Sequence, residues 1–171
     1  MFTGSLVALV TPFDGNDRVD YASLKRLVDF HVEQGSSGLV IAGTTGESPT
    51  LKRSEHIELI GRCVEIAAGR IPIVAGTGSN STAQSIELSR AVSDPGIAAY
   101  MAVVPYYNKP TQEGIFRHYT ALADAIDQPL LMYNVPGRTV ADLLPETVAR
   151  LSRHENIFGV KEATGDIDRL R

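Results

Sequence analysis

The sequence has 171 residues, of which 43% are hydrophobic and 21% are charged. A chain of this length and composition corresponds to one globular domain and excludes an intrinsically disordered protein. The net charge of −4 disfavours nucleic acids and anionic membranes as partners, and no apolar run reaches the ~20 residues of a membrane span. The single cysteine excludes an internal disulfide and fits the reducing environment of the cytoplasm.

Apolar runs typical of buried strands alternate with amphipathic stretches typical of helices. The predicted strands are residues 6–10, 38–42, 71–75, 98–104, 130–132 and 157–160. The predicted helices between them are residues 21–34, 53–68, 82–92, 112–125 and 144–151, and a further helix is predicted to open at 165–171. Asp20 is the predicted N-cap of the first helix, and Gly35 is its predicted C-cap glycine.

This alternation predicts an α/β fold with a parallel sheet. The strand runs are continuously apolar, as expected for strands that are buried on both faces. Residues 1–171 read as a single domain, for which an open doubly wound sheet and a (β/α) barrel both fit. A dinucleotide-binding domain would carry a glycine-rich loop after its first strand, where this sequence has TPFD. The glycines at positions 76 and 78 are interpreted as part of a turn.

Polar side chains follow most of the predicted strands at their carboxyl ends. In parallel α/β architectures these ends meet on one side of the sheet, where active sites form. We therefore expect hydroxyl, phenol, guanidinium and amine groups to converge there. The candidate residues are Thr44, Thr45, Tyr106, Tyr107, Tyr133, Arg138 and Lys161.

Lys161 directly follows the sixth apolar run, so its side chain is predicted to start inside the site. A desolvated lysine loses its proton more easily, and the neutral amine condenses with a ketone or aldehyde to a Schiff base. The alternative is a surface lysine paired with Glu162 or Asp166. Tyr133 ends the preceding strand and could shuttle protons to the lysine adduct, or it could cover the site with its hydroxyl bonded to backbone.

The remaining candidates also have two interpretations each. Thr44 and Thr45 lie in a turn flanked by glycines, where their hydroxyls could relay protons or bind a carboxylate. The alternative is turn chemistry plus helix capping, with Thr45 and Glu47 as ordinary cap-region residues. Arg138 follows a Pro-Gly pair, and its planar guanidinium suits a substrate carboxylate. Its alternative is a salt bridge with Asp142 or Glu146.

Tyr106 and Tyr107 are adjacent, so in an extended backbone their side chains point in opposite directions. One phenol could serve the site while the other packs on a partner subunit. Cys63 lies within a predicted helix and is interpreted as a core residue. The four histidines share no metal-ligand spacing, so no metal site is predicted.

Several segments together resemble the dihydrodipicolinate synthase (4-hydroxy-tetrahydrodipicolinate synthase) family. They are GTTGES at 43–48, PYYNKPTQEG at 105–114, YNVPGRT at 133–139 and GVKEATGD at 159–166, with VALVTPF at 7–13 and LPETV at 144–148. The resemblance covers the whole sequence, which corresponds to the N-terminal portion of such a chain. It implies a TIM (β/α)8 barrel and a class I lyase that condenses pyruvate with L-aspartate-4-semialdehyde in lysine and diaminopimelate biosynthesis.

The resemblance also implies a role for each candidate residue. Lys161 would form the Schiff base with pyruvate, and no metal or organic cofactor would be needed. Thr45 would bind the pyruvate carboxylate, and Arg138 would bind the carboxylate of the semialdehyde. The implied assembly is a homotetramer built as a dimer of dimers, in which one phenol reaches the site of a neighbouring subunit. The implied proton relay consists of Tyr133, Thr44 and Tyr107, the last being the residue from the neighbour.

Related pyruvate-dependent enzymes provide an alternative function. N-acetylneuraminate lyase and the 2-keto-3-deoxy sugar acid aldolases share the strand-six lysine and the strand-five tyrosine. Arg138 and the paired Thr44 and Thr45 favour the synthase over these sugar acid lyases.

Some members of the family are inhibited by lysine at a dimer interface. The positions that match such a site are Ser48, His56, Asn80 and Tyr106. Two positions depart from it, because Arg53 and Gln84 stand where sensitive members carry a histidine and a glutamate. Lysine inhibition is therefore a hypothesis for this sequence.

A (β/α)8 barrel has eight strands in ~250 residues, and only six strands are predicted here. We therefore expect a barrel that is truncated after strand six. If the natural protein ends at Arg171, we expect an unstable or inactive product, such as a non-catalytic fragment or an interaction module that keeps the tyrosine-bearing dimer face. If the sequence belongs to a longer protein, the enzymatic function applies to the parent.

Overall fold

The computed structural model describes residues 2–170, which form two compact units. The first unit contains the residues up to Gly76 together with Ala91–Ala99, and the second contains Thr77–Arg90 and the residues from Tyr100 onward. No helix within the described residues is both long and apolar enough to cross a membrane. A single barrel domain over residues 1–171 stays a prediction.

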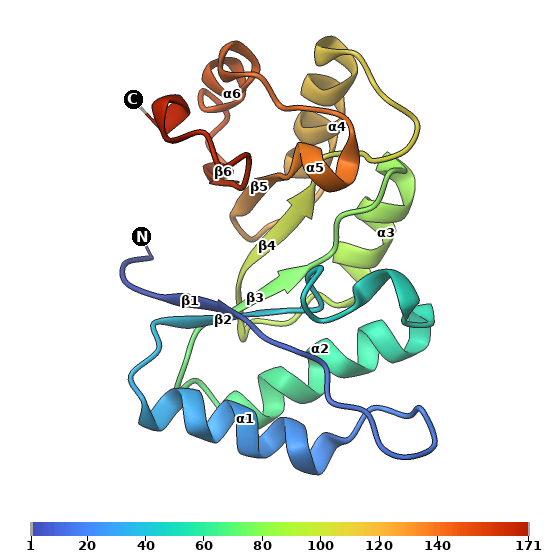
Figure 1. Cartoon of the computed structure of the whole chain (residues 1–171), viewed down its shortest axis with the longest axis vertical. Coiled ribbons are helices and arrows are strands. Elements are labelled where there is room, and N and C mark those ends of the chain that lie inside the picture. The colour runs from blue at the N-terminus through green and yellow to red at the C-terminus, as the bar shows by residue number, and fades with distance from the viewer. Residues whose placement is uncertain (1, 171) are drawn as a thin grey trace. The chain divides into compact units, whose positions relative to one another are not determined.

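Three parallel strands form the sheet of the first unit (Figure 1). Val7 pairs with Leu39, and Val40 pairs with Val74. Every residue of the second and third strands is buried, as their unbroken apolar runs predict. The elements are β1 (Leu6–Ala8), β2 (Gly38–Ile41), β3 (Ile73–Gly76), α1 (Tyr21–Glu33), α2 (Arg53–Ala67) and the 3-10 helix η1 (Ser48–Thr50).

Helix α1 has the caps that its sequence predicts. The side chain of Asp20 accepts a hydrogen bond from the backbone N–H of Ser23 at 3.0 Å. Gly35 has a φ of +73°, which glycine adopts without strain, and its N–H donates to the carbonyl of Val32 at 3.2 Å. The predicted ends of this helix are therefore confirmed to within one residue.

The core of the first unit lies between the sheet and its two long helices. Helices α1 and α2 pack against each other and bury one face each, with Leu24 and Val28 on α1 and Leu59 and Ile60 on α2. Cys63 is also fully buried on α2, and burial raises the pKa of its thiol to about 12. Its interpretation as a core residue is confirmed.

The second unit contains a second set of parallel strands and the remaining helices. Val103 pairs with Tyr133, which in turn pairs with Lys161. Helices α4 and α6 pack against each other. The elements are α3 (Thr82–Ala91, to Arg90 in this unit), β4 (Ile97–Val103, from Tyr100 in this unit), α4 (Gln112–Asp124), β5 (Leu130–Asn134), α5 (Pro136–Thr139), α6 (Pro145–Leu151), β6 (Ile157–Glu162) and the 3-10 helix η2 (Ile167–Leu170).

Helix α4 supplies much of the core of this unit through fully buried Ile115, Tyr119 and Leu122. The hydroxyl of Tyr119 donates to the carbonyl of Ala102 at 3.0 Å, so its polar end is satisfied inside the core. Gly78 lies so close to β4 that a Cβ there would stand 2.4 Å from the backbone nitrogen of Val103. Only glycine fits this position without a shift of the strand.

Several elements differ from the sequence-based prediction. Strand β1 ends at Ala8 instead of residue 10, β3 begins at Ile73 instead of residue 71, and β5 continues to Asn134 instead of ending at residue 132. Strand β6 continues to Glu162 instead of ending at residue 160, because its pairing with β5 extends to Asn134. The short helix α5, which begins at the Pro-Gly pair at 136–137, and the 3-10 helix η1 were not predicted. The helix predicted at 165–171 is the 3-10 helix η2, and residue 171 lies outside the described residues.

Candidate active site at the ends of strands β5 and β6

Tyr133 and Lys161 occupy matching positions on neighbouring parallel strands. Residues that pair directly across a parallel ladder project from the same face of the sheet, so the two side chains lie together. The amine nitrogen of Lys161 is 4.2 Å from the centroid of the Tyr133 ring. The expected convergence of a strand-end amine and a strand-end phenol is thus present in this unit.

The environment of Lys161 is that of a weakened base. Its side chain is half-buried, and burial lowers the pKa of its amine below the usual range because the ammonium loses hydration. Within residues 2–170, no salt bridge joins it to Glu162 or Asp166, the partners considered in the surface interpretation. A larger fraction of neutral, nucleophilic amine is therefore available at a given pH than for a free lysine.

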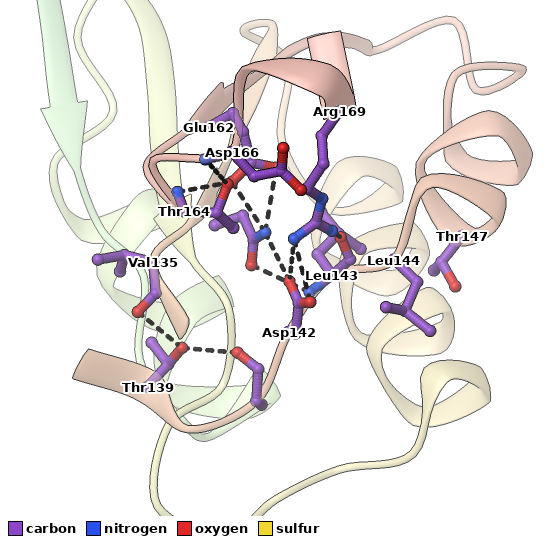
Figure 2. Close-up of polar contacts among 12 residues, drawn as sticks. Val135, Thr139, Asp142, Leu143, Leu144, Thr147, Glu162, Thr164, Asp166 and Arg169 are labelled. Atoms are coloured by element: carbon purple, nitrogen blue, oxygen red, sulfur yellow. Dashed lines mark hydrogen bonds and ion pairs between the residues drawn. The ribbon is translucent and has the colours of Figure 1, made fainter. Parts of the chain in front are cut away.

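Arg138 lies on α5, in the loop that follows β5. Its side chain is exposed, and the salt bridge to Asp142 considered as an alternative is not formed, since Asp142 pairs with Arg169. The buried hydroxyl of Thr139 bridges the loop beneath it, lying 3.1 Å from the carbonyl oxygen of Val135 and 2.7 Å from that of Ala141 (Figure 2). The guanidinium of Arg138 is therefore accessible to solvent, on a loop that is stabilised by the internal hydrogen bonds of Thr139.

Tyr107 projects into solvent with 87% of its surface exposed. Its φ of +73° is left-handed, so the extended backbone assumed for the Tyr106–Tyr107 pair is absent at this residue. The following Asn108 fastens the segment by donating from Nδ2 to the carbonyl of Asn80 at 3.1 Å. A bulky residue held in this strained conformation and turned away from its own unit is unusual for a side chain with only a packing role.

Thr44 and Thr45 belong to the first unit and lie in the turn after β2. Both side chains are exposed, and both residues lie in a turn in which the N–H of Glu47 donates to the carbonyl of Thr44 at 3.1 Å. The following 3-10 helix has Glu47 as its N-cap, so the turn and the cap position of Glu47 are confirmed, whereas Thr45 is not the cap. The turn is held from below by Thr11, whose hydroxyl donates to the carbonyl of Gly46 at 2.7 Å. Thr11 was recognised only as a strand-end residue, because a single hydroxyl in sequence does not reveal its partner.

The four positions of the possible lysine site divide between the units, with Ser48 and His56 in the first and Asn80 and Tyr106 in the second. His56 is buried, and its Nε2 lies 2.7 Å from the carbonyl oxygen of Gly76. Burial lowers the pKa of this histidine, which favours the neutral ring. In this structure Nε2 of His56 is therefore hydrogen-bonded to a backbone carbonyl.

A polar cluster behind the reactive pair was missed by the sequence-based reasoning. It joins Asn134, Asp142, Glu162 and Arg169 through side-chain hydrogen bonds (Figure 2). Two of its members directly follow Tyr133 and Lys161, so strand alternation alone places them on the opposite face. Across residues 2–170, no group of three or more acidic, histidine or cysteine side chains is arranged to hold a metal ion.

Comparisons with known proteins agree with these observations. The model of the dihydrodipicolinate synthetase family matches residues 1–171. The 4-hydroxy-tetrahydrodipicolinate synthase of Pseudoalteromonas atlantica is 58% identical over 171 residues, which make up 100% of this chain and 58% of that protein. The chain thus spans well under two thirds of the length of the curated relatives it matches.

Solved structures show the same fold. The chloride-inhibited dihydrodipicolinate synthase from Acinetobacter baumannii, complexed with pyruvate, has a TM-score of 0.96 at 51% identity, covering 99% of this chain and 58% of that one. The corresponding synthase from Cyanidioschyzon merolae, with lysine bound, has a TM-score of 0.94 at 41% identity, covering 98% of this chain and 58% of that one. The predicted fold class, a TIM (β/α)8 barrel with six of its strands in these residues, is confirmed.

Proposed function

The chain belongs to the dihydrodipicolinate synthetase family, and from this premise we propose that it acts as a class I lyase. The reaction condenses pyruvate with L-aspartate-4-semialdehyde to 4-hydroxy-tetrahydrodipicolinate, in lysine and diaminopimelate biosynthesis. The observation that carries the proposal is the half-buried amine of Lys161, 4.2 Å from the centroid of the Tyr133 ring. The relative from Acinetobacter baumannii complexed with pyruvate supports pyruvate as the first substrate.

The chemistry assigned to Lys161 is imine formation. The neutral amine attacks the keto carbon of pyruvate, a C–N bond forms, and the keto oxygen leaves as water. Burial supports this role because it lowers the pKa of the amine and so increases the neutral fraction. The resulting Schiff base withdraws electrons from the pyruvate methyl carbon, which gives up one proton to a base in the site. The enamine so formed is the nucleophile that attacks the aldehyde carbon.

Proton transfer and substrate binding are assigned to the other candidates. Tyr133, whose ring centroid lies 4.2 Å from the amine, would exchange protons with the adduct, in a relay with Thr44 and Tyr107. The exposed hydroxyl of Thr45 would bind the pyruvate carboxylate. The exposed guanidinium of Arg138 would bind the carboxylate of the semialdehyde through its planar fork.

We infer an assembly of several copies of this chain in the cytoplasm, as a dimer of dimers. Tyr107 supports it, because a phenol with 87% of its surface exposed is available to reach a neighbouring subunit. Analytical ultracentrifugation of the wild-type chain and of Tyr107→Ala would test the assembly. A monomer at micromolar concentration for the wild-type chain would contradict it.

Lysine inhibition is the regulatory part of the proposal. The Cyanidioschyzon merolae relative with lysine bound supports it, and so do the matching residues Ser48, His56, Asn80 and Tyr106. Gln84 lacks the carboxylate that would pair with the amine of a ligand, and its Oε1 accepts a hydrogen bond from the Ser79 hydroxyl at 3.1 Å. A rate that is unchanged by millimolar lysine would refute this part alone.

Borohydride trapping tests the catalytic proposal directly. Incubation with pyruvate and borohydride should add the mass of one reduced pyruvate to the peptide that contains Lys161. The variant Lys161→Ala should gain nothing, while Lys109→Ala, which removes an exposed lysine, should be labelled like the wild-type chain. Absence of label on the wild-type chain would favour the alternative of a non-catalytic fragment or interaction module.

Substrate choice separates the synthase from its sugar acid relatives. Steady-state assays with pyruvate and either aspartate semialdehyde or N-acetylmannosamine should show turnover of the semialdehyde only. Turnover of the sugar without the semialdehyde would assign the protein to the N-acetylneuraminate lyase type.

A further inference from the structure

The residues that follow Tyr133 and Lys161 are tied together on the opposite face of the sheet. Asn134 and Glu162 are the next pair in the register of β5 and β6. The side-chain nitrogen of Asn134 lies 3.1 Å from both carboxylate oxygens of Glu162. Asn134 is fully buried and Glu162 is half-buried, so this bond is largely shielded from water.

The same amide closes the loop that carries Arg138. Nδ2 of Asn134 donates to Oδ1 of Asp142 at 2.9 Å, and Oδ1 of Asn134 accepts from the backbone N–H of Leu143 at 3.0 Å. Two carboxylates face the amide nitrogen and one N–H faces the amide oxygen, so only one orientation of this side chain satisfies all its partners. The loop between residues 134 and 143 is therefore fastened to the end of β5.

A second layer of contacts holds the two carboxylates. Arg169 donates from Nη1 to both oxygens of Asp142, at 3.0 and 3.1 Å, and from Nη2 to the carbonyl of Leu143 at 2.9 Å. The backbone N–H of Thr164 donates to Oε1 of Glu162 at 3.1 Å. These donors offset the repulsion between two carboxylates that share one amide.

We propose that Asn134 and Glu162 are positioning residues for the condensation at Lys161. Their hydrogen bond fixes the end of β6 to the end of β5, and thereby sets where the amine stands relative to the Tyr133 ring. The bonds of Asn134 to Asp142 and Leu143 fix the loop bearing Arg138 to the same strand end. The inference rests on the function proposed for Lys161. Asn134 and Glu162 directly follow Tyr133 and Lys161 and project from the opposite face of the sheet. A shift of the backbone at Asn134 or Glu162 therefore also moves the side chains of Tyr133 and Lys161.

The geometry also separates positioning from a direct electrostatic effect. Among the residues described, Glu162 directs its oxygens to Asn134 and Thr164 and forms no salt bridge with Lys161. If Glu162 acts through its charge, any carboxylate at this position is sufficient. If Glu162 acts by positioning, its side chain must be long enough to bring an oxygen within hydrogen-bond distance of Asn134. These two requirements can be separated by substitution.

The test compares Glu162→Gln, which keeps the reach and loses the charge, with Glu162→Asp, which keeps the charge and shortens the side chain by one methylene. The rate of borohydride trapping of pyruvate on Lys161 should fall about 10-fold or more in Glu162→Asp. It should stay within about threefold of wild type in Glu162→Gln, whose amide oxygen can still accept from Asn134 and Thr164. Glu155→Asp, on an exposed residue without a side-chain contact described here, serves as the matched control.

A second readout does not depend on pyruvate. The pH profile of Lys161 acetylation by acetic anhydride, followed by peptide mass spectrometry, reports the environment of the amine. Its midpoint should move upward toward that of free lysine in Glu162→Asp, because the loosened end of β6 exposes the amine to water. It should not move in Glu162→Gln or in Glu155→Asp.

The outcomes distinguish this inference from the proposed function. A wild-type chain that never traps pyruvate refutes the function, while the acetylation profile still decides whether Glu162 positions Lys161. The inference would be overturned if folded Glu162→Asp trapped pyruvate and were acetylated as the wild-type chain is. It would also be overturned if Glu162→Gln and Glu162→Asp lost the same fraction of the trapping rate. Circular dichroism at the assay temperature confirms that each variant is folded.

Discussion

Two buried polar side chains in the second unit, Asn134 and His118, differ in how fully their polar atoms are hydrogen-bonded. Asn134 is completely buried and uses both ends of its amide, toward Asp142, Glu162 and the backbone of Leu143. His118 on α4 is 96% removed from solvent, since only 4% of its surface is exposed. Its Nδ1 lies 2.9 Å from the hydroxyl of Thr82, and Nε2 has no hydrogen-bond partner among the residues described.

The contrast shows that burial alone does not tell what a polar side chain does for a fold. A saturated amide joins separate segments and stabilises their arrangement, whereas an unsatisfied ring nitrogen carries a desolvation cost. Burial accordingly lowers the pKa of His118 from its ordinary value of 6.5 to about 4. The following substitutions test this difference.

The largest effect is expected for Asn134→Ala. The substitution removes the hydrogen bonds to two carboxylates and one N–H and leaves those groups without this partner. We expect a loss of about 3–5 kcal/mol in the free energy of unfolding, measured by urea titration followed by circular dichroism. Asn16→Ala, at an exposed position, is the matched control. A loss below about 1 kcal/mol would show that the cluster adds little stability.

His118 should make stability depend on pH. Its folded pKa lies below its unfolded value of 6.5, so its contribution is complete above pH 6.5 and is lost as the pH falls toward about 4. Between pH 7.5 and pH 5, this group should remove about 2 kcal/mol. The stability of His118→Phe relative to wild type should rise by that amount over the same interval, since phenylalanine does not titrate. If the difference in the free energy of unfolding between His118→Phe and wild type did not change with pH, His118 would not be the source of this pH dependence.

A smaller effect is expected for Thr82→Val, which keeps the shape of the side chain and removes the hydroxyl next to His118. The loss of one neutral hydrogen bond should cost about 1 kcal/mol at pH 7.5. Thr120→Val on α4 provides the control, because Thr120 is similarly half-buried and its hydroxyl has no partner described here. Equal urea midpoints for the two variants would mean that the contact with His118 is not stabilising.

The smallest effect is expected at the surface. Glu113 accepts hydrogen bonds from Arg117 at 3.0 Å and from Arg150 at 2.9 Å, and these arginines lower the pKa of its carboxyl. Both pairs are exposed to water and salt, so Glu113→Gln should leave the urea midpoint unchanged at moderate ionic strength. A clear shift would show that the number of hydrogen bonds matters more than their burial.

The sequence was informative where one residue type in one position implies one chemistry. The lysine and tyrosine at consecutive strand ends could be predicted as neighbours, because parallel strands bring their carboxyl ends together. The caps of α1 and the core position of Cys63 could also be predicted from local patterns. Each of these inferences needs only the residue and its immediate periodicity.

The features that were missed depend on partners far along the chain. Strand β6 was expected to end before Lys161 because polar residues usually mark a strand end. It continues because Glu162 meets Asn134, 28 residues earlier, on the far face of the sheet. The extended backbone assumed for Tyr107 failed for a related reason, since its left-handed φ belongs to a segment fastened by Asn108 to Asn80.

The loop closed by Asn134 and Leu143 carries Arg138, the residue proposed above to bind the carboxylate of the second substrate. The positions between them include Arg138 and are fastened to the rest of the unit mainly at the two ends, while the hydroxyl of Thr139 bonds to Val135 and Ala141 within the loop itself. They can therefore be exchanged as one cassette, provided that the amide at position 134 and the carboxylate at position 142 are kept. Variation in substrate preference would then collect between these two anchors, and libraries that randomise the anchors themselves would lose the lysine's alignment before they gained a new specificity.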